Sequence, residues 1–429
     1  MVETERYPDK RGGSHGVRAV PGLIVVDRAC VTLDTSEVTA SWLEIDLSRL
    51  EANVAAVRRL VGPAIRVCGV VKADAYGMGA LPIARRLAAA GADMLAVYSP
   101  EQAAPLVGAV PSPILVPILV MMPVRRIDPD GALAPALRDG RLHLTLHDAA
   151  HLDDVEAIGA DLGASVPLHL HIDTGMSRMG LNAERVRDVA EAVRATRHID
   201  VAGIYTHFAA AEDDVAFTDS QMTRFEQALD DAANVLPDDL IVHAANTFAV
   251  HRNARYHRSM VRVGLGLYGY GPPLMEGPPR VTDAPTVRPI MRWVSALAHV
   301  ECWPRGASVG YNRTHRLDQD TLLGVVPAGY GDGYALALSN QAVVRIGEGD
   351  ARFEAPVLGR VNMDQVVVDL SAAKGPVRCG DPVELISNDP EAPNSVEALA
   401  RMAGSSCYEV LCRLSRVPKK YVEGRGHCA

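Results

Sequence analysis

Between residues 66 and 263 the sequence alternates short apolar runs with amphipathic stretches, and this alternation limits the possible folds more than any other feature. The apolar runs are typical of strands, whereas stretches such as 182–196 and 220–236 carry apolar residues at helical spacing. The runs begin near Arg66, Met94, Ile114, Arg141, Pro167, Asp200, Leu240 and Val261. Eight strand–helix units in about 200 residues predict a closed (β/α)8 barrel, a TIM barrel, with an open doubly wound sheet as the alternative.

The sequence changes character after Pro289, where short strand-like runs separated by turns replace the helical periodicity. This pattern predicts a second, mostly β domain with its own core. Near the N-terminus, Trp42 to Asp46 is typical of a strand, and the spacing of Ser48 and Glu51 predicts a capping box at the start of a helix. We therefore expect an N-terminal extension over 1–41, the barrel over 42–288 and the C-terminal β domain over 289–429.

Charge and hydropathy argue against several classes of protein. The chain carries 43 basic and 52 acidic residues, and its formal net charge of -9 is spread without long runs of one sign, so neither nucleic acid nor a membrane surface is an expected partner. The longest apolar run, Ile114 to Val124, is too short to span a bilayer. The polar N-terminus and seven scattered cysteines predict a cytoplasmic protein with reduced thiols.

Lysine is rare in this chain, which has five, and Lys72 is the only one between residues 11 and 373. It follows the apolar run Cys68 to Val71 and precedes Gly77 and Gly79, so it stands where a strand turns toward a helix. Barrel enzymes place their chemistry at such strand ends. A partly desolvated lysine there becomes a nucleophilic amine that can form a Schiff base. The alternative is an ordinary exposed lysine at a strand terminus.

The residues around Lys72 resemble a known motif. Val-Val-Lys72-Ala-Asp-Ala-Tyr76-Gly is similar to the pyridoxal 5'-phosphate (PLP) lysine motif of the alanine racemases, a family of barrel-type, fold-type III PLP enzymes. Other segments resemble this family in the same order: His171-Ile-Asp-Thr-Gly-Met-Ser-Arg178, Tyr205-Thr-His207-Phe, His243-Ala-Ala-Asn246-Thr247, Val261-Arg262-Val-Gly264-Leu265, Val309-Gly-Tyr311, Ala328-Gly-Tyr330, Asn362-Met363-Asp364 and Tyr408-Glu-Val. The resemblance extends from residue 42 to the end of the chain.

The resemblance implies a function and a set of site residues. It implies a PLP-dependent isomerase that interconverts L-alanine and D-alanine, supplies D-alanine for peptidoglycan, and works as a homodimer with active sites shared between subunits. Lys72 and Tyr311 match the two catalytic bases. The matching cofactor-binding positions are Lys72, Tyr76, His207, Asn246, Thr247, Arg262, Gly264, Leu265 and Tyr408. The substrate-binding positions are Arg178, Met363 and Asp364, and no metal is expected.

The chemistry of these side chains agrees with the implied roles. Racemisation needs acid–base groups on opposite faces of a planar carbon, which Lys72 and Tyr311 can supply. An arginine stays protonated and has no acceptor atom. Arg262 can therefore donate to the ring nitrogen of the cofactor without protonating it, which restrains side reactions such as transamination.

Three positions depart from the resemblance. His171 stands where the family often has a carbamylated lysine that holds the arginine matching Arg178. Asn312 and Asn362 stand where glycine and a cysteine or serine are common. A histidine cannot supply the negative charge of a carbamate, so we expect a neutral His171 that accepts a hydrogen bond or supports a bound anion. A broader amino-acid racemase, for example one that accepts serine, is the alternative specificity.

Two other classes of function are open to the sequence. His169 and His171 lie two residues apart and face the same side of a strand, and with Asp173 they could serve a metal-dependent hydrolase on a barrel. That interpretation leaves Lys72 and Tyr311 without a role. A non-catalytic PLP-binding regulator would resemble the barrel alone, so the β domain argues against it.

Overall fold

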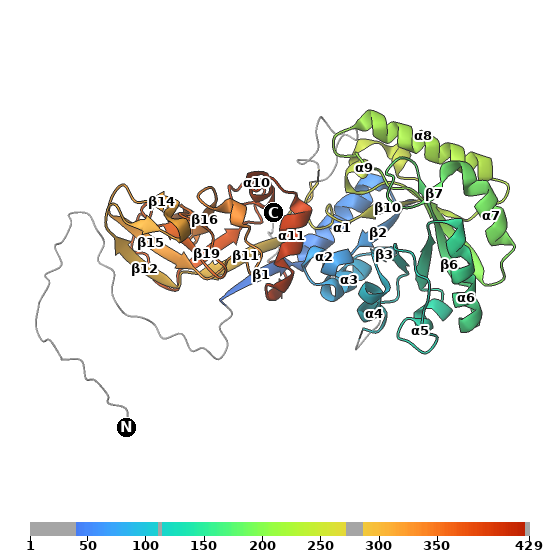
Figure 1. The fold of residues 1–429 in the computed structure, drawn as a ribbon, viewed down its shortest axis with the longest axis horizontal. Helices are drawn as coiled ribbons and strands as arrows, with labels where there is room; N and C mark the ends of the chain where they lie inside the picture. The colour runs from blue at the N-terminus through green and yellow to red at the C-terminus, as the bar shows by residue number, and fades with distance from the viewer. Residues whose placement is uncertain (1–39, 110–113, 272–285, 425–429) are drawn as a thin grey trace, which may run out of the picture.

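The computed structural model describes residues 40–109, 114–271 and 286–424. Eight parallel strands close into a barrel, because β2 pairs with β10 and β5 pairs with β6 (Figure 1). The barrel strands are β2 (Arg66–Val70), β3 (Met94–Val97), β4 (Ile118–Val120), β5 (Leu142–Leu146), β6 (Val166–Asp173), β8 (Ile199–Tyr205), β9 (Ile241–His243) and β10 (Met260–Val263). The predicted barrel is confirmed, and the open sheet is excluded.

Helices surround this barrel. They are α1 (Leu47–Val61), α2 (Lys72–Tyr76), α3 (Ala80–Ala89), α4 (Pro100–Val107), α5 (Ala134–Arg138), α6 (Leu152–Leu162), α7 (Val186–Arg194), α8 (Val215–Ala232) and α9 (Thr247–Arg252). Helix α7 illustrates their patterning, because Val186, Val189, Ala190 and Val193 are its buried residues and share one helical face. Short 3-10 turns and the two-residue strand β7 (Leu181–Asn182) complete the connections.

The second domain is mostly β, as predicted. Its six-stranded sheet has the order β17 (Phe353–Pro356), β16 (Val343–Ile346), β19 (Pro382–Ile386), β11 (Met291–Ala296), β1 (Ser41–Asp46) and β20 (Lys419–Val422). A three-stranded sheet contains β12 (His299–Trp303), β15 (Thr321–Val326) and β18 (Val366–Asp369), and β13 (Ser308–Val309) pairs with β14 (His315–Arg316). Helices α10 (Val396–Met402) and α11 (Cys407–Arg413) follow, and α11 lies between the two domains in Figure 1.

The N-terminal part of the described chain differs from expectation in two respects. Strand β1 pairs with β11 and β20 in the second domain and not with the barrel strands. Helix α1 is capped by Asp46, whose side chain accepts a hydrogen bond from the Arg49 backbone N–H at 2.9 Å. The predicted capping box is therefore wrong, because Ser48 already lies inside the helix. The expected extension 1–41 lies outside the described residues except for its last two.

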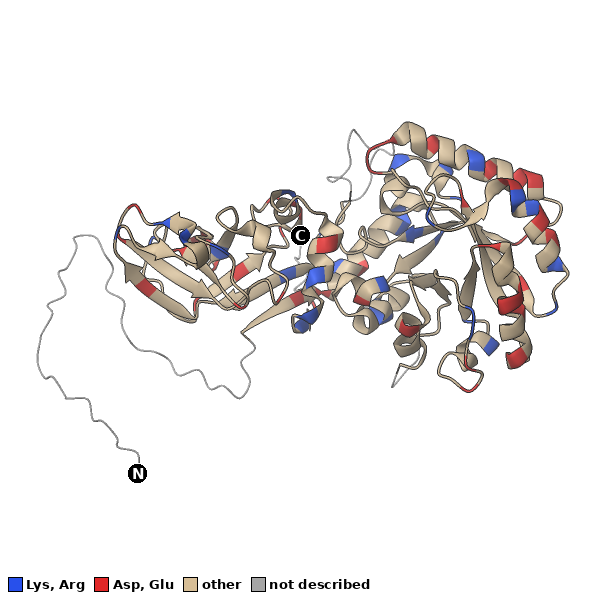
Figure 2. Cartoon of the chain, viewed as in Figure 1, with Lys and Arg blue, Asp and Glu red and all other residues tan. Residues whose placement is uncertain are grey.

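The surface of the protein carries charges of both signs. Figure 2 shows lysines and arginines interspersed with aspartates and glutamates along the outer helices of the barrel. None of the helices within 40–109, 114–271 and 286–424 combines the length and the apolar character needed to cross a membrane.

Candidate active site

A cavity of about 690 Å³ opens at the carboxyl ends of the barrel strands. It brings together nine of the predicted site residues: Lys72, Tyr76, Arg178, His207, Asn246, Thr247, Arg262, Gly264 and Tyr408. These residues come from strands β2, β6, β8, β9 and β10 or the segments that follow them and, for Tyr408, from helix α11. Sequence segments more than 300 residues apart therefore build a single pocket.

Lys72 follows strand β2 and begins the segment labelled α2, which is a turn with left-handed backbone geometry and not a regular α-helix. Ala73, Asp74, Ala75 and Tyr76 all have φ between 52° and 55°, which is the left-handed helical region. This region costs about 1–2 kcal/mol per residue for non-glycine residues, and such strain concentrates at functional sites. Gly77 follows at φ 82°, and a Cβ at that position would lie 2.7 Å from the Leu411 carbonyl of α11. The turn that begins at Lys72 therefore packs closely against α11 at Gly77.

The surroundings of Lys72 favour a neutral amine. Burial lowers the pKa of Lys72 below its usual value, and the positive charges of Arg178 and Arg262 lower it further. A lower pKa raises the fraction of the amine that can act as a nucleophile or accept a proton. The lysine that the sequence singled out therefore has the electrostatic setting of a reactive group.

Arg262 on β10 is a buried cation, 4% exposed, that lines the cavity. Its Nη1 lies 2.8 Å from His243 Nδ1, and its Nη2 donates to the Thr206 carbonyl at 2.8 Å. His207 Nδ1 is 3.3 Å from Nη2. The guanidinium also lies over the ring of Tyr205, 4.9 Å from the ring centroid. Among the described residues no carboxylate pairs with Arg262, so its partners are neutral.

One end of the cavity is an open backbone cradle. A Cβ on Gly264 would lie 2.3 Å from the Tyr76 hydroxyl oxygen, so glycine is needed there for the close approach. Thr247 Oγ1 accepts a hydrogen bond from the Gly266 N–H at 3.1 Å. The rings of Tyr76 and Tyr408 lie 5.8 Å apart between their centroids. Hydroxyls and backbone N–H groups thus gather where an anionic group can be held.

The hydrogen bonds of His171 define its protonation. His147 Nε2 lies 2.8 Å from the Met121 carbonyl and must donate to it, so His147 Nδ1 is an acceptor. His171 Nδ1 lies 2.9 Å from that acceptor and therefore carries the proton. Burial and the neighbouring His147 lower the pKa of His171 to about 2, which supports the expectation of a neutral side chain. Its Nε2 lone pair remains as the acceptor on the ring.

Four predicted residues do not line this cavity. Leu265 is buried behind it at 1% exposure. Tyr311, Met363 and Asp364 lie in the second domain, and Tyr311 and Met363 are 71% and 55% exposed. Within a single chain, the structure therefore separates the proposed second base from Lys72.

The sequence did not assign a role to Tyr205, which lines the cavity at the end of β8. Its ring stacks on His171 with 4.4 Å between the ring centroids and on His243 with 4.8 Å. The signal available in the sequence was its place at a strand end, two residues before His207. Tyr205 therefore contacts both His171 and His243, and its ring also forms a cation–π contact with Arg262.

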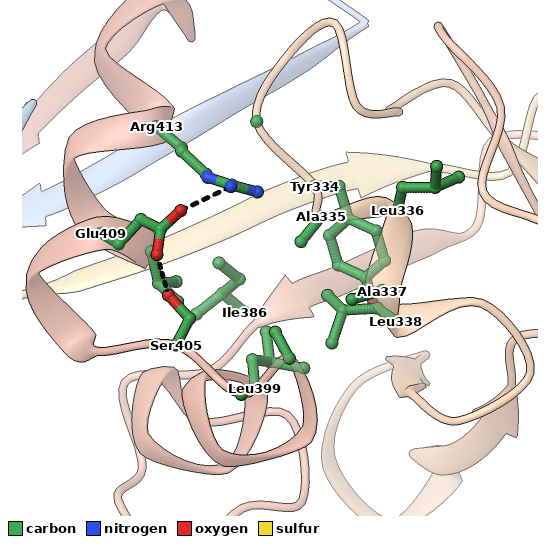
Figure 3. A pocket seen from close by; sticks show the side chains of 14 residues that line it. Tyr334, Ala335, Leu336, Ala337, Leu338, Ile386, Leu399, Ser405, Glu409 and Arg413 are labelled. Atoms are coloured by element: carbon green, nitrogen blue, oxygen red, sulfur yellow. Dashed lines mark hydrogen bonds and ion pairs between the residues drawn. The ribbon is translucent and has the colours of Figure 1, made fainter.

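A second cavity, of about 370 Å³, lies in the second domain next to α11 (Figure 3). Tyr334, Leu338 and Leu399 contribute apolar surface to its wall. Its charged residues are already paired, because Arg413 Nη2 donates to Glu409 Oε1 at 2.5 Å. The first cavity is therefore the better candidate for chemistry.

The two histidines of the hydrolase alternative do not converge on one point. His169 bonds to His143 and His243, whereas His171 bonds to His147. In the part of the chain that the structure describes, no group of three or more His, Cys, Asp or Glu residues has the arrangement of a metal site. Among the described residues, the geometry therefore provides no set of metal ligands for the hydrolase alternative.

The fold and the cavity define a class: a (β/α)8-barrel protein with a desolvated lysine, a glycine-containing backbone cradle and a buried arginine around one pocket. The family models "Alanine racemase, N-terminal domain" and "Alanine racemase, C-terminal domain" match residues 45–272 and 290–421. The chain belongs to the alanine racemase family.

Individual relatives agree with this assignment. The alanine racemase of Desulfovibrio desulfuricans is 34% identical over 387 residues, 89% of this chain and 98% of the relative. That of Halothermothrix orenii is 31% identical over 387 residues, 89% of this chain and 96% of the relative. A solved alanine racemase structure from Streptomyces lavendulae is similar with a TM-score of 0.78 and 29% identity, and the match covers 90% of this chain and 98% of that one.

Proposed function

We propose that this protein is a PLP-dependent racemase that interconverts L-alanine and D-alanine and supplies D-alanine for peptidoglycan. The observation that carries the proposal is the shared pocket of Lys72, Arg262 and the Gly264 cradle. The test is incubation of the purified protein with L-alanine or L-serine, followed by chiral chromatography. We expect D-alanine to form faster than D-serine; a faster reaction with serine would assign the broader specificity instead.

The pocket fits PLP at both of its ends. The cradle at Gly264, which a Cβ would fill, and the Tyr76 hydroxyl suit the phosphate. Lys72 suits the aldehyde, and the buried Arg262 suits the ring nitrogen. When bound, PLP supplies an electron sink that acidifies the α-proton of the amino acid.

The side chains then divide the acid–base work. The Lys72 amine holds or releases a proton on one face of the substrate α-carbon, and its lowered pKa favours acceptance near neutral pH. The Tyr311 hydroxyl does the same on the opposite face. Arg178 binds the substrate carboxylate, and Met363 with Asp364 orients the substrate.

We also propose a homodimer with shared active sites, a proposal that the exposed position of Tyr311 outside the cavity supports. The segments that carry the three separated residues adjoin one another, because a Cβ on Gly310 would lie 3.4 Å from the Arg360 nitrogen and Gly331 N–H donates to the Met363 carbonyl at 2.8 Å. We propose that this exposed surface of the β domain, 289–429, meets the cavity of the partner's barrel, 42–288. Two exposed free thiols, Cys302 and Cys379, suit the reducing cytoplasm as the compartment.

Replacing Gly264 with alanine should weaken PLP binding. The new Cβ would occupy the cradle within 2.3 Å of the Tyr76 hydroxyl oxygen. Losing one or two hydrogen bonds to a charged group corresponds to an affinity decrease of about tenfold or more. Titration of the cofactor-free protein with PLP, followed by tyrosine and tryptophan fluorescence, measures this. Gly375→Ala is the control, because a Cβ at that position would have no atom within 4 Å. Equal PLP affinities in both variants would contradict a phosphate-binding role for the cradle at Gly264.

Replacing His171 with lysine should leave a folded, active racemase. The wild type already holds a neutral group at this position, so its activity should not depend on added bicarbonate. The lysine variant should gain activity when bicarbonate is added, since a carbamate would restore a negative charge beside Arg178. Initial rates with and without bicarbonate measure both effects. A bicarbonate requirement in the wild type, or an inert variant that still binds PLP, would contradict this interpretation of His171.

A further inference from the structure

Three buried histidines form a hydrogen-bonded chain through the inside of the barrel, outside the cavity. His143 Nδ1 on β5 lies 2.9 Å from His169 Nε2 on β6. His169 Nδ1 lies 2.9 Å from His243 Nε2 at the end of β9. His243 Nδ1 lies 2.8 Å from Arg262 Nη1 on β10. We call these three side chains the histidine relay; it connects Arg262 to the opposite wall of the barrel.

The direction of every hydrogen bond in the relay is fixed at Arg262. A guanidinium only donates, so His243 Nδ1 must accept and its proton must be on Nε2. That proton is donated to His169 Nδ1, and the same logic places the His169 proton on Nε2, where it is donated to His143. The relay ends at the backbone of Gly140, which hydrogen-bonds with His143. All three imidazoles therefore share the Nε2–H tautomer, opposite to His171.

Burial keeps the relay uncharged. It holds the pKa of His169 and of His243 well below the usual value, and it lowers the pKa of His143 to about 4. Each neutral imidazole points its lone pair toward Arg262 and its N–H away, so the three dipoles are aligned to stabilise the cation. Chains of hydrogen bonds of this kind polarise one another.

Gly203 makes the relay possible. Strand β8 lies between β6 and β9, and His169 must reach across it to contact His243. A Cβ on Gly203 would lie 2.3 Å from His169 Nδ1 and 2.5 Å from its Cε1. The φ of Gly203 is not in the left-handed region, so the requirement for glycine here is one of space. Position 203 of β8 therefore needs a residue without a side chain, because the His169 ring occupies the space of a Cβ.

Among the described residues, the relay compensates for the missing counter-ion of the buried Arg262 side chain. A buried charge is expensive without a partner, and an arginine usually has a carboxylate there. Within the described residues Arg262 has only neutral acceptors: the carbonyls of Thr206 and Ala244, and the rings of His243 and His207. The relay stabilises the guanidinium and at the same time leaves its full positive charge available to the pocket.

We propose that His143, His169 and His243 are positioning residues that orient Arg262 and replace its counter-ion. By fixing His243 as an acceptor, the relay holds the guanidinium in one orientation toward the ring nitrogen of the cofactor. This proposal rests on the proposed function for its consequence in catalysis, but the relay itself exists without cofactor.

The first test reads the tautomers in the cofactor-free protein. Long-range 15N–1H correlation spectra of protein labelled with 15N-histidine distinguish Nε2–H from Nδ1–H rings, and single-histidine variants assign the signals. We expect Nε2–H for His143, His169 and His243 and Nδ1–H for His171 at pH 7. An Nδ1–H or doubly protonated ring at any relay position would overturn the proposal. This result does not depend on activity, so it separates failure of the relay from failure of the proposed function.

The second test breaks the relay far from the pocket. His143→Leu removes the acceptor for His169, whereas His143→Gln keeps both an acceptor and a donor. We expect kcat of the leucine variant to fall about tenfold with KM nearly unchanged, and the glutamine variant to recover most of it. Equal kinetics in wild type and His143→Leu, or equal impairment in the leucine and glutamine variants, would contradict a positioning role.

Gly203→Ala disrupts the relay at another point, the hydrogen bond between His169 and His243, and serves as the test if His143→Leu does not fold. The new Cβ displaces the His169 ring, so we expect the Nε2–H signal of His243 to lose its partner and kcat to fall by a similar factor. The matched control is Gly69→Ala on β2, where the new Cβ would contact only methyl ends of leucine side chains, the nearest being Leu87 at 2.9 Å. Unchanged His243 signals in folded Gly203→Ala would contradict the relay.

Discussion

Replacing Lys72 with alanine should reduce racemisation by at least about 10³-fold while the protein stays folded, because in the proposed mechanism the variant loses one of two acid–base groups and the amine that holds the cofactor. The fold should persist, since Lys72 is only half-buried and lies beyond the last residue of strand β2. Initial rates by chiral chromatography and circular dichroism of the same sample measure both properties.

The control for this substitution is Lys374→Ala. Lys374 is an exposed lysine of the second domain, and its removal should leave the rate within the error of the wild type. A folded Lys72→Ala variant with more than a tenth of the wild-type rate would show that another group does the chemistry. A comparable loss in Lys374→Ala would show that lysine content, and not position 72, matters.

Mixing two inactive variants should restore activity. In the proposed homodimer, a hybrid of Lys72→Ala and Tyr311→Phe subunits has one site with both defects and one with neither. Equal mixing and free exchange give hybrids for half of the dimers, so the mixture should reach about a quarter of the wild-type rate. The measurement is the racemisation rate before and after subunit exchange at low denaturant concentration.

The same experiment contains its own control. A mixture of Lys72→Ala with a Lys72→Ala, Tyr311→Phe double variant has no intact site in any combination and should stay inactive. If hybrids form, as mass spectrometry of tagged subunits can show, and activity does not return, Tyr311 does not act on the partner's Lys72. Tyr311 would then remain an exposed residue of the β domain without a role in the shared site.

Local patterns were sufficient to predict much of this fold. Apolar runs located all eight barrel strands, since buried parallel strands read as continuous apolar segments. Lys72 could be identified because it was both isolated and at a strand end.

Long-range contacts could not be predicted in the same way. The pairing of β1 with β11 joins residues about 250 positions apart, and no local pattern distinguishes it from a barrel strand. Helix α11 was missed because it has seven residues and only Cys407 and Leu411 are buried. The relay depends on His169 crossing β8 at Gly203, a contact between strands that no local sequence pattern reveals.

The central claim is that Lys72 holds the cofactor in the barrel pocket. The most direct measurement is borohydride reduction of the PLP-loaded protein, followed by proteolysis and peptide mass spectrometry. The chain has five lysines, so the attachment point is unambiguous. We predict that the reduced cofactor is found on the peptide that contains Lys72. Its recovery on Lys10, Lys374, Lys419 or Lys420, or its absence from every peptide of a protein that racemises alanine, would contradict the claim.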